Sequence, residues 1–324
     1  NIGDVILTLP VLDRLRQIYP EADITVMAGK RPKEIFENNP NIKRVIVYNR
    51  RAWIKEKINL FMELKKERFD VVIDLRNSFF GYLLPAKYKT SFLAPIPKEI
   101  KHMKERHLYK IRKLGIADAN VRETPKRDSL YIKPADEKYI NELLADNGIT
   151  KKDKVAVISP GARSHIKRWP GDKFLELIQA LSRDFKLKII LSGDKDDIAI
   201  TKYILENSRE PVVDLSGKTD IAQLAVLIKR AVCVISNDSA LLHLASYLNV
   251  PLVAIFGPTD EDKYGPWSDS SVIVKKDIFC RPCDKAQCKY LNLKCMQLVG
   301  KEDVLRALSA ILGLAQTPQL TADK

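Results

Sequence analysis

The stretch from residue 232 to residue 267 constrains the fold more than any other part of the chain. It reads VCVISNDSALLHLASYLNVPLVAIFGPTDEDKYGPW. Residues 232–235 and 251–256 are apolar, β-rich runs typical of buried strands, and residues 240–248 between them have the spacing of a helix. Units of this kind join parallel strands through a right-handed crossover. The sequence therefore predicts an α/β fold with a parallel sheet.

Two polar loops, NDSA at 237–240 and GPTD at 257–260, follow these strands. Because parallel strands end at the same edge of a sheet, both loops are expected where open α/β sheets bind ligands. The first loop also opens a helix, whose free N–H groups favour a phosphate. We interpret it as a diphosphate cradle. The alternative is an ordinary helix cap on a structural unit.

The rest of the chain alternates between strand and helix patterns, which predicts parallel sheets covered on both faces. The polar segment 148–154 lacks apolar periodicity and marks a domain boundary, so we expect domains at 1–150 and 151–324. Helices are expected at 4–19, 53–66, 136–147, 171–183, 198–207, 221–230 and 301–314, and strands at 22–27, 45–48, 69–75, 155–159 and 187–192.

Four motifs in order along the chain carry a family resemblance. They are IGDVILTLP at 2–10, PGA with KRWP at 160–170, NDSALLHLA with PLVAIFGPTD at 237–260, and the cysteine-rich segment 280–296. The chain resembles the ADP-heptose–lipopolysaccharide heptosyltransferases, which are GT-B glycosyltransferases. The resemblance implies two Rossmann-like domains facing a cleft, with the acceptor on the first, the nucleotide sugar on the second, and a last helix that returns to the first. It also implies a strand before Ile2, so the first strand is expected to be missing.

Sugar transfer from a nucleotide diphosphate needs a base for the acceptor hydroxyl and positive potential for the leaving group. Asp4 is the candidate base, and the resemblance supports this role; the alternative is that it caps its helix. Lys167 can meet phosphate oxygens as a compact charge, or it can be surface charge beside Trp169. The resemblance favours Lys167 as the diphosphate contact and Ser164 as a lesser one.

Within the strand–helix–strand segment 232–267, the backbone N–H groups of Ser239 and Ala240 are expected to face the diphosphate. Asp238 would repel phosphate, so we expect it to cap the helix or to contact the donor sugar. His243 lies one turn after Ser239, and the resemblance places it at the donor site. A lone helical histidine is otherwise a packing residue. Ala240 replaces a glycine of the family.

Ribose recognition calls for an acid near a strand end, and we select Asp197, with Asp196 nearly as suitable. Thr219 is expected to line the adenine pocket through backbone contacts. Two D-x-D patterns, at 194–196 and 260–262, could hold Mg²⁺ beside a diphosphate. The resemblance instead implies that transfer requires no metal or other cofactor.

Four of the five cysteines, Cys280, Cys283, Cys288 and Cys295, have the spacing C-x2-C-x4-C-x6-C. Four thiolates can form a structural Zn²⁺ site or hold an Fe–S cluster. The alternative is a reduced, packed loop. Disulfides are not expected if the protein is cytosolic.

The chain carries 55 Lys and Arg against 41 Asp and Glu, a net charge of +14, which favours an anionic partner. The basic segment 98–113 is either a solvated helical face or a docking surface for acidic acceptor groups near a membrane. No apolar run reaches the roughly 20 residues of a membrane span. We therefore expect a cytoplasmic protein with peripheral contact to the anionic inner leaflet.

The resulting hypothesis is an inverting glycosyltransferase that moves heptose, or a related sugar, from an ADP-sugar to an acidic glycolipid acceptor of the lipopolysaccharide inner core. One alternative is a glycosyltransferase of the same fold that uses another nucleotide sugar. Another is a non-catalytic glycolipid- or nucleic-acid-binding protein. No nucleic-acid partner is expected, because basic clusters with interleaved aromatic residues are lacking.

Overall fold

The computed structural model describes residues 1–91, 95–115 and 126–313, which form two compact units. The first unit is Asn1–Tyr131 and the second is Ile132–Lys324. The division lies ahead of the expected boundary at 150, because helix α6 (Pro134–Asp146) packs on helix α9 (Ile221–Arg230) of the second unit.

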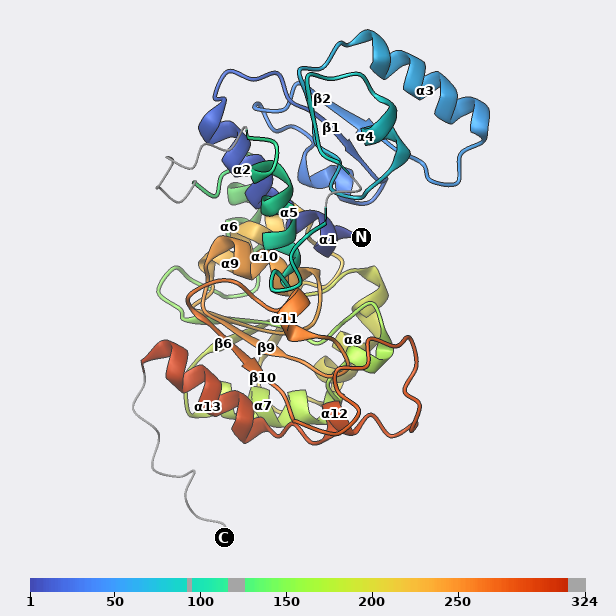
Figure 1. Cartoon of the computed structure of the whole chain (residues 1–324). Helices are drawn as coiled ribbons and strands as arrows, with labels where there is room; N and C mark the ends of the chain where they lie inside the picture. Colours follow the sequence, from blue (N-terminus) through green and yellow to red (C-terminus); the bar gives the residue numbers. More distant parts are fainter. Residues whose placement is uncertain (92–94, 116–125, 314–324) are drawn as a thin grey trace. The chain divides into compact units, whose positions relative to one another are not determined.

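The second unit is built on a six-stranded parallel sheet (Figure 1). Its strand order is β10-β9-β8-β5-β6-β7, so the order reverses between β5 and β8, as in doubly wound nucleotide-binding folds. Registers such as Val157 opposite Val234 align the carboxyl ends of these two strands. The strands are β5 (Val155–Ser159), β6 (Lys188–Leu191), β7 (Val212–Asp214), β8 (Cys233–Asn237), β9 (Leu252–Ile255) and β10 (Ser271–Val274).

Helices cover both faces of this sheet. Helices α7 (Gly171–Arg183), α8 (Ile198–Asn207) and α13 (Lys301–Leu312) lie on one face, and α9 and α10 (Ala240–Leu248) lie on the other (Figure 1). The predicted strand–helix–strand unit is confirmed as β8–α10–β9, with β8 and β9 parallel neighbours. Shorter helices complete the unit: η2 (His165–Lys167), η3 (Lys195–Asp197), α11 (Glu261–Tyr264) and α12 (Lys294–Gln297).

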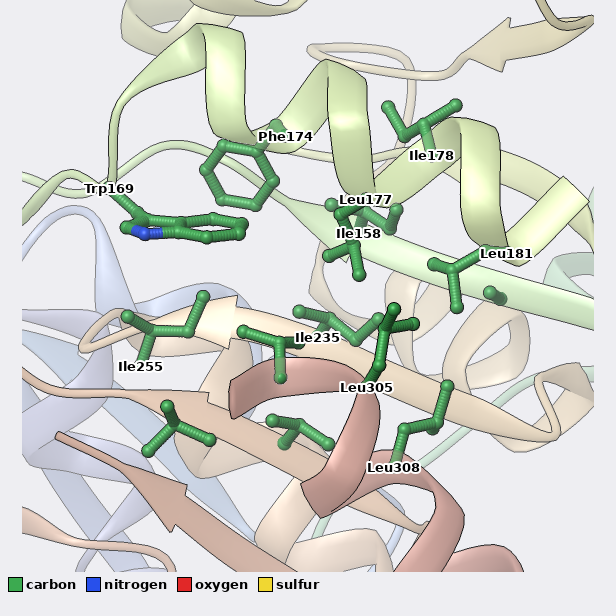
Figure 2. Close-up of a cluster of buried hydrophobic side chains, with 14 of the residues drawn as sticks. Ile158, Trp169, Phe174, Leu177, Ile178, Leu181, Ile235, Ile255, Leu305 and Leu308 are labelled. Atoms are coloured by element: carbon green, nitrogen blue, oxygen red, sulfur yellow. The ribbon is translucent and has the colours of Figure 1, made fainter. Parts of the chain in front are cut away.

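The core of the second unit lies between the sheet and the α7–α13 layer. Figure 2 shows Phe174 and Leu177 of α7, Ile158 and Ile235 of the strands, and Leu305 of α13 directed toward one another. Helix α13 thus packs in the core of its own unit. A return of the last helix to the first domain stays a prediction. Residue 314, the last of the expected helix 301–314, lies outside the described residues.

In its described residues, the first unit has fewer β-strands than the second. Strands β1 (Thr25–Ala28) and β2 (Arg44–Val47) form one parallel pair, and β3 (Val71–Val72) and β4 (Tyr88–Lys89) form another. Its helices are α1 (Ile2–Ile6), α2 (Leu9–Ile18), η1 (Pro32–Ile35), α3 (Ile54–Lys66), α4 (Phe79–Leu83) and α5 (Met103–Arg112).

Two expected elements of the first unit differ from the structure. The predicted helix 4–19 is divided, because Pro10 has no N–H to continue a helix and is placed in the first turn of α2. The predicted strand 69–75 is reduced to Val71–Val72, because the Asp74 carboxylate accepts bonds from the N–H groups of Arg76 and Ser78 and forms a turn.

Candidate functional site

The candidate site lies in the second unit, where the loops after β5 and β8 adjoin at the reversal of strand order. Helix α10 begins here. Its N-cap residue, Ser239, makes no side-chain cap, and its hydroxyl lies 3.0 Å from the Ser236 hydroxyl instead. The first-turn N–H groups are therefore left for another acceptor, with Ser239 and Ala240 half-buried at the helix start.

Asn237 and Trp169 hold the loop after β5 in place. The buried Asn237 amide donates to the Pro160 carbonyl at 2.8 Å, and its oxygen accepts from the Trp169 N–H at 3.1 Å. The Trp169 ring is buried against Phe174, and its indole N–H donates to the Val299 carbonyl at 3.0 Å. The segment 160–169 is thus fixed at both ends (Figure 2 shows Trp169).

Lys167 projects from this segment toward the loop after β8. Its ammonium lies 2.6 Å from the carboxylate of the buried Asp238. Asp238 therefore pairs with a cation, and the expectation that it caps α10 is wrong, because Ser239 occupies the N-cap without a side-chain cap. The pair fixes an ammonium group beside the open start of α10. Ser164 begins η2 and its carbonyl accepts the Lys167 N–H at 3.0 Å, so it shapes the same turn.

Asp197 lies at the adjacent loop, after β6. One of its oxygens accepts from the Asp194 N–H at 3.1 Å, and the other lies 3.5 Å from the Arg168 guanidinium. Burial raises the pKa of the Asp197 carboxyl. Gly161 makes this approach possible, since a Cβ there would lie 2.0 Å from the Asp197 Cγ. Asp196 is exposed, so of the two acids considered only Asp197 adjoins the loop after β5.

Thr219 and His243 have different surroundings. Thr219 is half-buried in the loop after β7, two residues beyond Gly217, whose N–H donates to the Gly193 carbonyl at 2.9 Å. It therefore lies at the same sheet edge as Asp197. The His243 ring is buried in α10 and stacks on Trp267 with centroids 5.9 Å apart. Its role at the donor site stays a prediction.

The D-x-D segments serve as helix caps. Asp194 accepts from the Asp196 N–H at 2.8 Å at the start of η3, and Asp260 accepts from the Asp262 N–H at 3.0 Å at the start of α11. The carboxylates of Asp194 and Asp260 therefore each accept a backbone hydrogen bond within their own turn.

The structure does not support a Zn²⁺ or Fe–S site at Cys280, Cys283, Cys288 and Cys295, one of the two alternatives for these residues. Across the described part of the chain, no group of three or more His, Cys, Asp or Glu side chains is placed to hold a metal ion, and these cysteines are free. Burial, followed by the neighbouring thiols of Cys280, Cys283 and Cys288, raises the pKa of Cys295.

Other bonds hold the cysteine-rich segment. The Arg281 guanidinium donates to the Gly257 carbonyl at 2.5 Å and to Glu261 at 2.8 Å, and the Cys283 N–H donates to the Pro258 carbonyl at 2.9 Å. The segment therefore braces the GPTD loop after β9, as a packed, reduced loop would.

Asp4 belongs to the first unit. It lies in the first turn of α1, after the N-cap residue Asn1, and its side chain is exposed. Within residues 1–91, 95–115 and 126–313, its carboxylate makes no hydrogen bond or ion pair. Its role as the base stays a prediction.

The sequence did not identify Asn237, which holds the loop after β5 in place, or Arg168, which is the partner of Asp197. Asn237 directly follows an apolar strand, and a polar amide at the end of a buried strand must find partners. That pattern could have identified it. Arg168 had no comparable indication, because its partner is 29 residues away in the sequence.

The strand reversal, the open helix start and the neighbouring cation are typical of nucleotide-binding α/β units, and the whole chain has the GT-B fold. A solved glycosyl transferase family 9 structure from Veillonella parvula covers 96% of this chain and 94% of its own, with a TM-score of 0.82 and 23% identity. The solved Escherichia coli ADP-heptose lps heptosyltransferase II has a TM-score of 0.74 and 23% identity over 96% of both chains.

Residues 58–294 match glycosyltransferase family 9 (heptosyltransferase), and the chain belongs to this family. It is 29% identical to lipopolysaccharide heptosyltransferase 3 of Escherichia coli strain K12, over 96% of this chain and 95% of that relative. The predicted fold class and the predicted glycosyltransferase family are confirmed.

Proposed function

We propose that this chain is an inverting glycosyltransferase that moves heptose, or a closely related sugar, from an ADP-sugar to an acceptor of the lipopolysaccharide inner core. The observation that carries the proposal is the Lys167 ammonium fixed by Asp238 beside the uncapped start of α10. This arrangement suits a diphosphate leaving group. The names of the similar Escherichia coli proteins supply the sugar, the nucleotide and the acceptor class.

In this proposal the donor is bound by the second unit. The N–H groups of Ser239 and Ala240 and the Lys167 ammonium donate to the diphosphate oxygens, with Ser164 as a lesser contact. Because amide dipoles and a lysine stabilise the leaving charge, transfer requires no metal or other cofactor. Asp197 binds the ribose.

Three further residues are assigned by position. Thr219 lines the adenine pocket from the loop after β7, and Asp238 and His243 contact the donor sugar. Asp238 has a second task, since its carboxylate holds Lys167 in place at 2.6 Å.

The first unit binds the acceptor and supplies Asp4 as the general base. The base must remove a proton from the acceptor hydroxyl as the sugar carbon is attacked from the face opposite the diphosphate, which inverts the anomeric centre. The net charge of +14 suits an acceptor that carries phosphates and acidic sugars, and it suits peripheral contact with the anionic cytoplasmic leaflet. None of the described helices combines the length and apolar character needed to span a bilayer.

Calorimetric titration with ADP and with UDP, followed by a transfer assay read by mass spectrometry, tests the proposal. We expect ADP to bind and UDP to bind more weakly, and ADP-heptose to be consumed with glycosylation of the core acceptor. Preferred binding of UDP would point to another nucleotide sugar. Nucleotide binding without transfer would indicate a non-catalytic relative.

The base is tested by Asp4→Asn. We expect this variant to keep its ADP affinity and to lose turnover by ~100-fold or more, because only the proton transfer is removed. Asp23→Asn, at another exposed acid of the same unit, is the matched control and should keep wild-type turnover. Turnover of Asp4→Asn within a few-fold of wild type would exclude Asp4 as the base.

A further inference from the structure

Helix α3 of the first unit presents a row of apolar side chains to solvent. Ile54, Ile58 and Met62 follow one another at four-residue spacing and are 75%, 54% and 49% exposed, and Trp53 at the N-cap is 82% exposed. Residues four apart lie on one side of a helix. The row is therefore continuous along about two turns of α3.

A different side of the same helix holds it to the unit. Leu64 is buried with Ile46 and Leu84, and Leu60 and Phe61 pack against this cluster. The Phe61 ring contacts the Phe80 ring of α4 edge-on, with centroids 6.5 Å apart. The exposed row is thus in addition to the apolar side that the fold itself uses.

The charges of α3 are divided by side. At about 100° per residue, Lys65 falls within the exposed row and Lys55 and Lys66 border it, whereas Glu63 falls on the opposite side. Arg44 of β2 pairs with Glu63 and, at 3.1 Å, with Glu67. Glu63 and Glu67 are therefore paired with a cation away from the row.

The three lysines have no such partners: among the described residues, Lys55, Lys65 and Lys66 form no ion pair. We call the surface formed by Trp53, Ile54, Ile58, Met62, Lys55, Lys65 and Lys66 the α3 face. It combines an apolar row with unpaired positive charge, and a tryptophan at its end. This combination is typical of helices that lie in a membrane interface.

The basic segment 98–113 was predicted to be either a solvated helical face or a docking surface, and part of its charge is used within the first unit. The Lys110 ammonium donates to the Asp74 carbonyl at 3.2 Å and to the Asn77 side chain at 2.6 Å, and burial lowers its pKa. Arg106 donates to the Ile100 carbonyl at 3.0 Å, and His107 is buried. Two of the cations of α5 are thus directed into the unit, whereas the three α3 lysines are exposed and lie beside an exposed apolar row.

We propose that the α3 face docks this protein on a bilayer that contains anionic phospholipids. Ile54, Ile58, Met62 and Trp53 enter the boundary between headgroups and acyl chains, and the lysines contact lipid phosphates. The charge complementarity between the unpaired lysines and an anionic surface selects this occupant. The proposal rests on the proposed function, because an acceptor anchored in that membrane gives the docking its purpose.

Vesicle flotation of the full chain tests the docking. Wild type should float with vesicles in which part of the phosphatidylcholine is replaced by phosphatidylglycerol, and less with phosphatidylcholine alone or at high salt. The triple variant Ile54→Ser, Ile58→Ser, Met62→Ser should lose ~10-fold or more of its vesicle affinity. The triple variant Lys55→Glu, Lys65→Glu, Lys66→Glu should lose at least as much on anionic vesicles.

Matched controls come from the second unit. Phe279→Ser with Leu291→Ser removes two apolar side chains that are 85% and 90% exposed, and Lys151→Glu with Lys152→Glu reverses two exposed charges. Both pairs should float as wild type does. Circular dichroism and ADP titration check that every variant is folded, and the α3 variants should bind ADP normally because their substitutions lie outside the donor site.

Fluorescence gives an independent measure of insertion. The emission of Trp53 should shift to the blue on anionic vesicles, and Trp53→Phe should abolish the shift although Trp169 and Trp267 remain. Flotation of both α3 triple variants at wild-type levels would overturn the proposal. So would a wild-type dimer that dissociates in the apolar triple variant while vesicle binding is absent, since the α3 face would then join two copies of the chain.

The two proposals fail in different ways. If docking is wrong, the α3 variants transfer sugar normally both to a soluble acceptor and to an acceptor in vesicles. If the proposed function is wrong, the wild type transfers to neither acceptor, whatever its flotation. If both are right, the α3 variants lose transfer only to the acceptor in vesicles.

Discussion

The two units of this protein differ in how much of their apolar surface they bury. The second unit packs α7, the strands and α13 into one continuous cluster beneath a six-stranded sheet. The first unit has two short strand pairs, buried apolar side chains that include Ile6, Ile35 and Ile111, a small separate cluster around Leu64, and an apolar row on α3 left exposed. The larger core of the second unit holds the Lys167 ammonium and the start of α10 in a fixed geometry. The docking proposed for the first unit instead requires apolar side chains that stay exposed.

This comparison predicts unequal costs for the same deletion. Leu177→Ala, in the core of the second unit, should cost about 4 kcal/mol of stability, because the rigid surroundings cannot close the cavity. Leu64→Ala, in the small cluster, should cost about 2 kcal/mol. Hydrogen exchange of amides in α7 and α3 measures each unit separately. Leu205→Ala on exposed α8 is the control, and equal costs would remove the contrast.

The stability of the first unit should also fall in acid because of one histidine, His107. Burial, followed by the Lys110 and Arg106 charges, lowers the pKa of His107 to about 4, against 6.5 in an unfolded chain. Above pH 6.5 both states are neutral and the contribution is complete. As pH falls from 6.5 to 4 only the unfolded state gains a proton, so stability falls by about 3 kcal/mol.

Denaturant unfolding of the first unit across this pH range checks the effect, with hydrogen exchange in α5 as the probe. His107→Gln should remove this part of the acid dependence, because it cannot gain a proton. His165→Gln, at an exposed histidine of the second unit, should leave it unchanged. An acid dependence that survives in His107→Gln would assign it to other groups.

The ion pair of the second unit should dominate donor binding. Lys167→Met should weaken ADP by ~100-fold, about 2.7 kcal/mol, because it removes a phosphate contact and leaves the Asp238 charge facing the diphosphate. Adding Asp238→Asn should restore ~10-fold of that loss, since the repulsion is gone. Calorimetry measures both. Lys202→Met, at an exposed lysine, is the control, and unchanged ADP affinity in Lys167→Met would exclude the assigned contact.

A smaller effect is expected at Gly161, which lies against the Asp197 carboxylate. Gly161→Ala would place a Cβ 2.0 Å from the Asp197 Cγ, so the carboxylate must move, and ADP affinity should fall ~10-fold. Gly29→Ala is the matched control, because its added Cβ would meet only ordinary contacts at 3.7 Å from Pro32. If Gly161→Ala binds ADP as wild type does, Asp197 has no part in the donor site.

Much of the second unit was predictable from the sequence. The expected helix limits at 171–183, 198–207 and 221–230 agree with α7, α8 and α9, because long apolar periodicity marks a helix unambiguously. Strands β7 and β10 were missed: each is short and only partly buried, so neither shows a distinct pattern. In the first unit, the turn at Asp74 ended a strand that periodicity alone would have extended.

The sequence by itself determined the parallel α/β fold, the family and the two polar loops at the strand ends, because these depend on local patterns and on motifs. Only the tertiary structure decided that Lys167 pairs with Asp238, that Arg168 meets Asp197, that the cysteine-rich segment holds the GPTD loop, and that α3 keeps an apolar row in solvent. Each of these depends on residues far apart in the chain, and no local pattern encodes which distant side chain fills a given space.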